Sequence, residues 1–347
     1  MRKRMKVILD ADDVLFNCNE EAVKDLNEEL GTDYKKSQIS KWGILGNGLD
    51  RRLKFFKDPD WIRSLPLMEG ATDFVSQLAE FAEILVVTNV EPRCAGARMD
   101  AIIRAFPEIN PSNILIGGRK DLLKADIMLD DRPENLEYAS GVEYPVLFRQ
   151  PWNYEKTGLY SVSTYEEFLT LAKMVQSGMG LCNPKDYDSI VLVGPSGSGK
   201  KYLADRLTER NRRIIRILSY TTKKDGIGYT HVSEEKFHSL AENGVFFETS
   251  SYMGHLFGTR EEDLQKVMED GGIPLLIMDI NGMIAMKSIY HPLAVYVTGS
   301  REECIRNILL RSIPTDEKVQ RIAAIDLESR NEQFCDITLT AGYNGSL

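Results

Sequence analysis

Residues 191–207 read VLVGPSGSGKKYLADRL, a short apolar run followed by a glycine-rich turn and a segment of helical composition. Gly194, Gly199 and Lys200 match the loop pattern G-x-x-x-x-G-K-[ST], in which main-chain N–H groups and a lysine hold a chain of phosphates. The last position of that pattern is a hydroxyl residue that binds Mg²⁺, and here it is Lys201. The stretch therefore predicts a strand, a phosphate-binding loop and a helix, with an altered residue at the metal position.

The size and composition of the chain indicate a globular protein with more than one domain. Its 347 residues exceed what one hydrophobic core usually holds. No run is long enough to cross a bilayer, and acidic residues come too early for a signal peptide, so we expect a cytoplasmic protein. The five cysteines form no C-x-x-C pair, which argues against a disulfide framework and a zinc site. The net charge of −9 argues against long nucleic acid as a partner, and small phosphorylated metabolites remain possible.

Apolar runs alternate with amphipathic stretches along both halves of the chain. The runs in the first half are MKVILD, EILVVTN, DIMLDD and YPVLF, and those in the second are SIVLVG, RIIRILSY, PLLIMDI, LAVYVTG and DITLT. Such alternation is typical of parallel sheets with crossover helices. A stretch rich in Gly, Pro and Asn separates the two sets. We therefore expect α/β domains at residues 1–178 and 187–347, joined by a linker at 179–186.

Polar residues end several predicted strands of the first half, at the edge where parallel sheets bind ligands. An isolated D-x-D pair is more often a polar turn, but several such groups in this order are hard to obtain from solvated loops. Clustered carboxylates repel one another unless a cation neutralises them, so we expect Mg²⁺ here. One carboxylate can then attack phosphorus and another can move a proton, while a hydroxyl and an ammonium hold phosphoryl oxygens. The residues concerned are Asp10, Asp12, Thr88, Lys120, Asp126, Asp130 and Asp131.

The order DADDVL, TN, K, DD resembles the haloacid dehalogenase-like phosphatases. The phrases VVTNVEPRCAGARMDAIIRAFPEI, KADIMLDDRPENL and VLFRQPWN resemble the 5′(3′)-deoxyribonucleotidase branch of that family. The resemblance implies a Rossmann-like domain with a small helical cap at roughly residues 16–70, and small nucleoside monophosphates as substrates. It makes Asp10 the nucleophile that becomes an aspartyl-phosphate, and Asp12 the general acid and base. It also assigns substrate or phosphoryl contacts to Thr88, Asn89 and Lys120, and Mg²⁺ contacts to Asp10, Asp12, Asp130 and Asp131.

Aromatic residues of the expected cap are candidates for contacts with a nucleobase, because that family packs cap aromatics on the base. Most of them are expected to be core residues instead, as aromatics usually are. Phe16 is favoured for the base contact because it lies so close to the catalytic loop. The full set of candidates is Phe16, Trp42, Phe55, Phe56 and Trp61.

The second half resembles the guanylate kinases over roughly residues 188–342. After the loop, SYTTKK, GYTHVS, FFET, GHLFGT and IMDINGM follow in the order of that family, which implies a P-loop domain that uses ATP and Mg²⁺. RNILLR and EKVQRIAA resemble the family's lid and make Arg311 and Arg321 the cations that contact the triphosphate and the developing charge. The residues expected to hold the ATP phosphates are Gly194, Ser196, Gly197, Ser198, Gly199, Lys200 and Lys201.

The acceptor site of the second half matches the family in its base-reading positions. Glu248 and Thr259 correspond to residues that read guanine, and Tyr229 corresponds to a substrate-binding tyrosine. Asp279 matches the acid near the metal, although the acid that precedes it in the family is Ile277 here. The resemblance therefore implies a guanine-type acceptor, a nucleoside monophosphate.

The phosphate clamp of the acceptor site departs from the family. Lys223 replaces an arginine and loses its bidentate geometry, a second arginine falls in an apparent deletion, and Phe257 lacks a tyrosine hydroxyl. Lys224 could compensate in part. Lys201 need not abolish catalysis, because the similar loop of adenylate kinases carries a glycine there. Its side chain could point away from the site or add positive charge at the Mg²⁺ position.

Three functions follow from these patterns. The favoured one is a nucleotidase fused to a nucleoside monophosphate kinase, with Mg²⁺ in both sites and ATP in the second. In the second, the kinase-like domain is a binding module without turnover, as loss of clamp residues would suggest. In the third, the chain repairs polynucleotide ends, against which the acidic charge balance argues.

Overall fold

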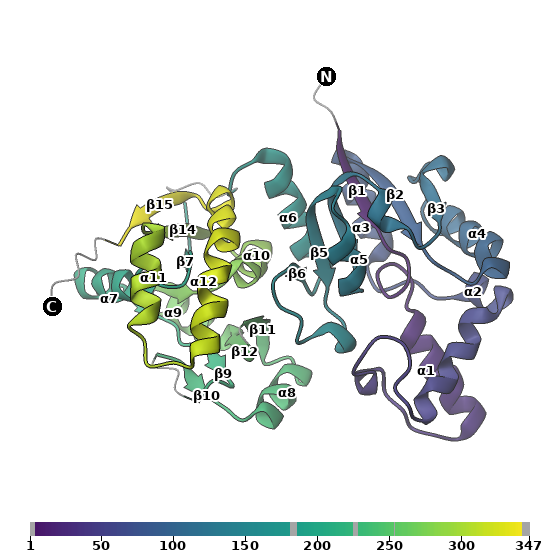
Figure 1. Ribbon diagram of the computed structural model, residues 1–347, viewed down its shortest axis with the longest axis horizontal. Helices are drawn as coiled ribbons and strands as arrows, with labels where there is room; N and C mark the ends of the chain where they lie inside the picture. Colours follow the sequence, from purple (N-terminus) through teal and green to yellow (C-terminus); the bar gives the residue numbers. More distant parts are fainter. Residues whose placement is uncertain (1–3, 181–185, 225–227, 253, 342–347) are drawn as a thin grey trace. The chain divides into compact units, whose positions relative to one another are not determined.

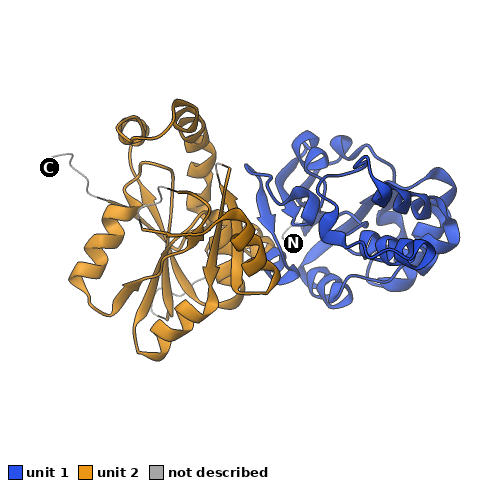
Figure 2. Ribbon diagram, turned by 90° about the horizontal axis from the view of Figure 1, so that it is seen from below, with its two compact units in different colours: residues 1–169 blue, residues 170–347 orange. Residues whose placement is uncertain are grey.

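The computed structural model describes residues 4–180, 186–224, 228–252 and 254–341. The chain divides into two compact units, residues 1–169 and 170–347 (Figure 2). Helix α6, Tyr165–Ser177, crosses that division. Residues 181–185 of the expected linker lie outside the described residues, and the domain limits at 178 and 187 stay a prediction.

The first unit is built on a six-stranded sheet with the order β3-β2-β1-β4-β5-β6, in which every pair of neighbours is parallel (Figure 1). Strand β1 lies between β2 and β4, and its Ile8 is in register with Leu85 and Met128. The carboxyl ends of these three strands therefore meet at one edge of the sheet. The strands are β1 (Met5–Leu9), β2 (Ala82–Thr88), β3 (Ile114–Ile116), β4 (Ala125–Asp130), β5 (Val142–Phe148) and β6 (Tyr160–Val162).

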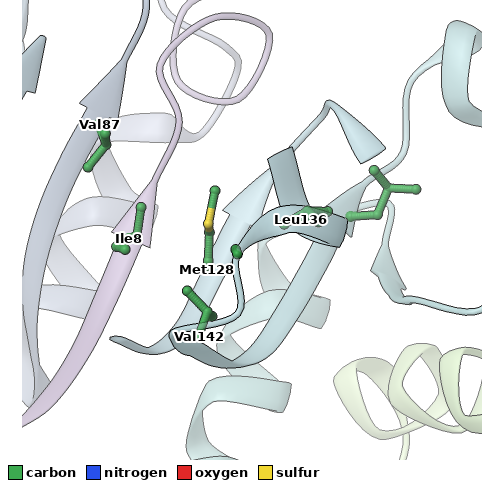
Figure 3. Packing of buried hydrophobic residues seen from close by; sticks show 7 residues of the cluster. Ile8, Val87, Met128, Leu136 and Val142 are labelled. Atoms are coloured by element: carbon green, nitrogen blue, oxygen red, sulfur yellow. The ribbon is translucent and has the colours of Figure 1, made fainter. Parts of the chain in front are cut away.

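Apolar side chains on both faces of this sheet explain why its strands are continuous apolar runs in the sequence. On one face, Ile8, Val87 and Met128 pack together and against Leu136 of helix α5 (Figure 3). Burial of each such side chain contributes about 1.5–3 kcal/mol relative to exposure. The helices of this unit are α1 (Cys18–Leu30), α2 (Pro59–Ser64), α3 (Ala71–Phe81), α4 (Ala95–Ala105), α5 (Pro133–Tyr138) and α6. Short 3₁₀ turns are η1 (Lys36–Gln38), η2 (Gly48–Lys57), η3 (Pro92–Cys94), η4 (Pro111–Asn113), η5 (Lys120–Leu122) and η6 (Pro151–Asn153).

Residues 16–70, here called the cap, form a helical segment between the loop after β1 and helix α3. Helix α1 ends where Gly31 adopts a left-handed conformation with φ of 65°, which a residue without Cβ adopts at little cost. The cap has its own apolar cluster of Val23, Leu26, Ile39 and Leu49, which also includes Trp152 from η6. The cap therefore has an apolar cluster of its own, to which one aromatic residue is supplied from outside the cap.

The second unit contains a five-stranded parallel sheet with the order β15-β14-β7-β13-β8 and a four-stranded sheet with the order β10-β9-β12-β11. Strand β7 is central in the larger sheet and leads directly into the glycine-rich loop and α7, as the opening stretch of sequence predicts. The strands are β7 (Ser189–Val193), β8 (Ile214–Arg216), β9 (Tyr220–Thr221), β10 (Thr230–His231), β11 (Phe246–Tyr252), β12 (His255–Arg260), β13 (Ile273–Ile277), β14 (Pro292–Thr298) and β15 (Ile337–Thr340).

Helices flank both sheets of the second unit, and α11 and α12 lie side by side (Figure 1). The helices are α7 (Lys200–Arg210), α8 (Glu234–Glu242), α9 (Glu261–Glu269), α10 (Ile280–Ile289), α11 (Arg301–Leu309) and α12 (Thr315–Ser329), followed by the turn η7 (Arg330–Phe334). None of the helices in the described part of the chain is long and apolar enough to cross a membrane. The α/β fold class expected for both halves is confirmed.

Candidate active sites

Three buried carboxylates meet at the carboxyl edge of the first sheet. Asp10 follows β1, and Asp130 and Asp131 lie at the end of β4, with one oxygen of each carboxylate within 4.8 Å of the others. Lys120 Nζ lies 2.6 Å from Asp10 Oδ1 and 2.6 Å from Asp130 Oδ2. The structure thus brings together four of the residues expected at this site, and one ammonium group contacts two of the three carboxyl groups.

The charges of this cluster perturb one another. Burial, followed by repulsion from Asp130, Asp10 and Asp13, raises the pKa of Asp131 well above its usual range. Burial also raises the pKa of Asp130 to about 6, although the attraction of Lys120 opposes that shift. Because one lysine does not balance three carboxylates, the site carries excess negative charge when ionised. An oxygen-only donor set of this kind fits a hard divalent cation such as Mg²⁺.

Thr88 lies beside this cluster at the end of β2, two residues beyond Val86, which pairs with Leu9. Its side chain is 0% exposed, and its Oγ1 has no hydrogen-bond partner among the described residues. A buried hydroxyl without a hydrogen-bond partner is unusual in a folded protein, and a ligand atom that forms this hydrogen bond would explain it. Asn89 follows, with its side chain against Gly118. The phosphoryl contact of Thr88 and the substrate contact of Asn89 stay predictions.

The Asp12 carboxylate makes contacts of a different kind. Its Oδ1 accepts hydrogen bonds from Cys18 Sγ at 3.1 Å and from Arg98 Nη2. Asp12 is not among the three acids whose oxygens converge, so a metal contact through its carboxylate stays a prediction. Asp126, at the start of β4, is also separate, since its carboxylate accepts the Lys6 N–H at 2.6 Å.

Arg98 is a site residue that the sequence reasoning missed. Its side chain is 0% exposed, its Cζ lies 4.7 Å from the centre of the Phe16 ring, and its Nε and Nη1 have no hydrogen-bond partner among the described residues. Position 98 lies on the buried face of α4 with Ala101 and Ile102. An arginine on the apolar face of an amphipathic helix was the signal in the sequence, because such a charge needs a partner.

The cap aromatics are placed in different surroundings. The Phe16 ring is 2% exposed, with one face toward Arg98 and a T-shaped contact to Phe106 at 6.1 Å, so its contact with a base stays a prediction. Trp42 is 38% exposed and lies 6.0 Å from Trp152. The remaining candidates pack with each other, at centroid distances of 5.8 Å for Phe55 and Trp61 and 5.3 Å for Phe56 and Trp61.

Side chains of η6 and α5 form hydrogen bonds with Asp131 and Asp130, and the sequence did not predict a role for these two segments. Trp152 Nε1 donates to Asp131 Oδ2 at 3.0 Å, and Asn153 Nδ2 donates to the Asp131 carbonyl at 2.7 Å. Asn135 Nδ2 lies 3.1 Å from each oxygen of Asp130. The phrase PWN follows a strand of the same parallel sheet, so its place at the carboxyl edge was the available signal.

The glycine-rich loop of the second unit adopts the conformation that its glycines permit. Gly194, Gly197 and Gly199 have φ values of 143°, 88° and 93°. A Cβ at Gly197 would lie 2.4 Å from the Cys304 carbonyl oxygen, and one at Gly194 would lie 2.3 Å from the Val297 carbonyl oxygen. The loop therefore requires glycine both for its backbone angles and for its close approach to neighbouring segments.

The lysine and serines of this loop surround the start of α7. Lys200 Nζ donates to the carbonyls of Gly194 and Pro195, and burial is the main cause that lowers its pKa to about 8. Ser198 Oγ is buried without a hydrogen-bond partner among the described residues. These groups converge at the N-terminus of a helix, which favours phosphate binding.

Both expected lid arginines reach the loop. Arg311 Nη1 and Arg321 Nη1 lie 3.2 Å and 3.0 Å from Ser196 Oγ. The Ser196 N–H donates to Glu328 Oε2 at 3.0 Å, and Glu328 Oε1 accepts from the Tyr252 hydroxyl at 2.9 Å. Glu328 was missed in the sequence because only the folded chain brings α12 to the loop.

The two residues of the second unit that are expected to read guanine form a buried pair. Thr259 Oγ1 lies 2.6 Å from Glu248 Oε1, and 3.1 Å from Ser219 Oγ. Asp279 caps α10 by accepting the Gly282 N–H at 2.9 Å. The carboxylate of Glu248 is therefore oriented by a hydroxyl on the adjacent strand.

The lysines near the acceptor site face different groups. Lys223 Nζ lies 2.7 Å from Glu317 Oε1, which also accepts from Arg321, and Lys224 is exposed. Lys201 Nζ lies 5.1 Å from the centre of the Tyr229 ring, and that ring contacts Phe257 at 5.5 Å. Burial, followed by repulsion from surrounding lysine and arginine residues, lowers the pKa of Lys201. The side chain of Lys201 therefore extends toward Tyr229.

Comparison with known proteins shows that each half of the chain is similar to a different protein family. Residues 4–176 match the family model described as 5′ nucleotidase, deoxy (Pyrimidine), cytosolic type C protein, and residues 187–339 match the guanylate kinase model. The 5′(3′)-deoxyribonucleotidase of Bacillus subtilis (strain 168) is 30% identical over 168 residues, which cover 46% of this chain and 94% of that protein.

Guanylate kinase of Helicobacter pylori (strain ATCC 700392 / 26695) is 31% identical over 144 residues, which cover 39% of this chain and 70% of that protein. The crystal structure of guanylate kinase from Anaplasma phagocytophilum aligns with 23% identity over 44% of this chain and 77% of that chain, with a TM-score of 0.35. The chain belongs to the 5′(3′)-deoxyribonucleotidase family through residues 4–176 and to the guanylate kinase family through residues 187–339.

Proposed function

We propose that the chain is a bifunctional nucleotide enzyme. Its first domain is a Mg²⁺-dependent 5′-(deoxy)nucleotidase that works through an aspartyl-phosphate, and its second is an ATP-dependent nucleoside monophosphate kinase of guanylate type. The observation that carries the first activity is the convergence of Asp10, Asp130 and Asp131 around Lys120, beside the Thr88 hydroxyl, which has no hydrogen-bond partner in the described part of the chain. Membership of the two families supports the pairing of activities.

In the proposed hydrolysis, an Asp10 oxygen forms a bond to phosphorus as the bond to the nucleoside oxygen breaks. Asp12 gives a proton to the departing oxygen and later takes one from the water that hydrolyses the aspartyl-phosphate. Lys120 and Thr88 donate hydrogen bonds to the phosphoryl oxygens. The three converging acids would hold Mg²⁺, which when bound neutralises the carboxylates and orients the phosphoryl group.

In the proposed kinase reaction, the loop and Lys200 hold the ATP phosphates, and Arg311 and Arg321 stabilise charge on the transferred group. Both arginines already lie within hydrogen-bonding distance of Ser196 Oγ in the loop. Glu248 can accept hydrogen bonds from guanine N–H groups, since its carboxylate is an acceptor held by Thr259. The proposed acceptor is therefore GMP or dGMP.

A panel of nucleoside monophosphates, assayed with and without ATP, tests both activities separately. We expect phosphate release without ATP, and diphosphate formation with ATP in the Asp10→Asn variant, where hydrolysis no longer consumes the substrate. Lys200→Ala in that background is the control and should abolish diphosphate formation, because the lysine supplies charge to the phosphate chain.

A second candidate is a kinase-like domain that binds nucleotide without turnover. It is favoured by the contact of Lys223 with Glu317, because this clamp lysine is already neutralised by a lid carboxylate. If no monophosphate yields diphosphate and Lys200→Ala behaves like its parent, the binding module replaces the kinase. Calorimetry with GMP and dGMP would then measure its affinity.

A further inference from the structure

Trp152 makes a direct contact with one of the three converging acids. Its indole Nε1 donates to Asp131 Oδ2 at 3.0 Å, and both side chains are buried. The next residue, Asn153, donates from Nδ2 to the main-chain carbonyl of Asp131 at 2.7 Å. A single short turn, η6, therefore holds Asp131 at its side chain and at its backbone.

The same indole ring packs into the cap. Trp152 is 8% exposed and shares an apolar cluster with Val23, Leu26, Ile39 and Leu49, which are all cap residues. Two further cap residues face the ring, with the Trp42 ring centre at 6.0 Å and Lys36 Nζ at 5.6 Å. One end of the indole thus belongs to the core of the cap, and the other end holds a carboxylate of the catalytic cluster.

We propose that Trp152 is a positioning residue that couples packing of the cap to Mg²⁺ affinity. The inference rests on the proposed metal site of the nucleotidase. Because the indole N–H occupies Oδ2 of Asp131, it orients the carboxylate and leaves Oδ1 for a cation. Outer partners that orient a ligand in this way typically change metal affinity about 10–100-fold when they are removed.

The coupling is reciprocal. If a packed cap strengthens Mg²⁺ binding by orienting Asp131, then bound Mg²⁺ must favour the packed cap by the same factor. A cap that covers the substrate would then be held in place most firmly when the site is loaded. The coupling depends on the Trp152–Asp131 hydrogen bond and on the packing of the Trp152 ring in the cap, and each of these can be altered separately.

Calorimetric titration of the protein with Mg²⁺, without substrate, tests the hydrogen bond. Trp152→Phe keeps an aromatic ring in the cap cluster and removes the N–H. We expect it to weaken Mg²⁺ binding by about tenfold or more. Trp61→Phe is the matched control, because it removes an indole N–H that donates to Asp25 Oδ2 at 2.6 Å within the cap. Unchanged affinity in Trp152→Phe, or an equal loss in Trp61→Phe, overturns the proposal.

A second pair of variants tests the packing. Leu26→Ala opens a cavity in the cap cluster, and Leu78→Ala opens one in α3, where Leu78 is equally buried. Both should lower the unfolding temperature, but we expect only Leu26→Ala to weaken Mg²⁺ binding, by several-fold. Equal effects of the two changes on Mg²⁺ binding contradict the coupling.

The titration of the wild-type protein separates this inference from the proposed function. A wild-type chain that binds no Mg²⁺ in the calorimeter overturns the metal site and with it the nucleotidase proposal. A wild-type chain that binds Mg²⁺, with Trp152→Phe binding it equally well, overturns the coupling alone. Circular dichroism of each variant at the titration temperature shows that folded protein is being compared.

Discussion

A single lysine residue gives each of the two candidate sites a distinctive feature. In the first unit, Lys120 contacts Asp10 and Asp130 at 2.6 Å each, and because it is one positive charge beside three carboxylates, the ionised cluster keeps a net negative charge. In the second unit, Lys201 occupies the loop position where a hydroxyl residue is typical, and it extends toward Tyr229. One lysine thus belongs to a carboxylate cluster, and the other lies against Tyr229, a residue expected to bind the acceptor.

Replacing Lys201 by Ser tests its role directly. Because its Nζ lies 5.1 Å over the Tyr229 ring, we expect Lys201→Ser to raise the KM for GMP several-fold while the KM for ATP changes little. The exposed Lys236 of α8 provides the control, and Lys236→Ser should leave both constants near the wild-type values. The Asp10→Asn background prevents hydrolysis of the acceptor. A rise in kcat without a change in the KM for GMP would instead place Lys201 at the metal.

Strands and helices assemble each site, because the functional groups lie at the ends of these elements. The acids follow β1 and β4 of the six-stranded sheet, and the phosphate loop follows β7 of the five-stranded sheet. Parallel neighbours bring their carboxyl ends together, and a helix N-terminus completes the phosphate loop. The geometry of the loop then depends on its glycines.

Gly197→Ala is expected to damage the phosphate loop. The new Cβ would lie 2.4 Å from the Cys304 carbonyl oxygen at a residue with φ of 88°, so the backbone must move. We expect more than a tenfold loss of ATP affinity by calorimetry and a lower unfolding temperature. Gly244→Ala is the matched control, because Gly244 has φ of 66° and a Cβ added there would meet nothing within 4 Å, so only the cost of about 1–2 kcal/mol for a left-handed residue applies. Equal ATP affinity in the two variants would refute the steric explanation.

The first turn of α6 contains a buried carboxyl group whose titration affects stability. Burial raises the pKa of Glu167 to about 7, although N–H groups of Ser163 and Thr164 oppose the shift. A carboxyl group with a folded pKa above its unfolded value of about 4.3 binds more protons in the folded state. Its contribution therefore makes the free energy of unfolding fall as pH rises from about 4.3 to about 7, after which it stays constant.

Glu167→Gln removes this titration. We expect its unfolding temperature, relative to wild type, to rise as pH is increased from 4 to 8, as measured by circular dichroism. The exposed neighbour Glu166 gives the control variant Glu166→Gln, whose difference from wild type should change little with pH. A difference for Glu167→Gln that is constant across that range contradicts the buried, protonated carboxyl.

Across the whole chain, the sequence predicted the α/β architecture and the acids that converge at the first sheet, because apolar alternation, strand-ending acids and a glycine-rich loop are local patterns. Apolar alternation predicted both parallel sheets, and DADDVL and DIMLDD predicted the acids that converge. The sequence did not predict roles for Arg98, Trp152 and Glu328, because each contacts a residue that is distant in the sequence. Their partners follow from tertiary packing, which no local pattern encodes.

Two activities on one chain would compete if they consumed the same monophosphate and would waste ATP. We therefore expect the two domains to prefer different nucleotides. The pairing of Glu248 with Thr259 favours guanine in the second domain, whereas residues 4–176 match a family model described as 5′ nucleotidase, deoxy (Pyrimidine). Rates of hydrolysis and of phosphorylation across all nucleoside monophosphates measure the two preferences. The same rank order for both reactions would show this expectation to be wrong.

The nucleotidase proposal depends above all on Asp10 as the nucleophile, and phosphate release by Asp10→Asn is the decisive assay. The change is nearly isosteric and removes the attacking oxygen, so turnover of the preferred nucleoside monophosphate should fall below about a hundredth of wild type. Asp126→Asn is the control, because Asp126 lies at the start of β4, where its carboxylate accepts the Lys6 N–H, and this variant should keep near wild-type turnover. A folded Asp10→Asn protein that releases phosphate at more than about a hundredth of the wild-type rate would contradict the covalent mechanism.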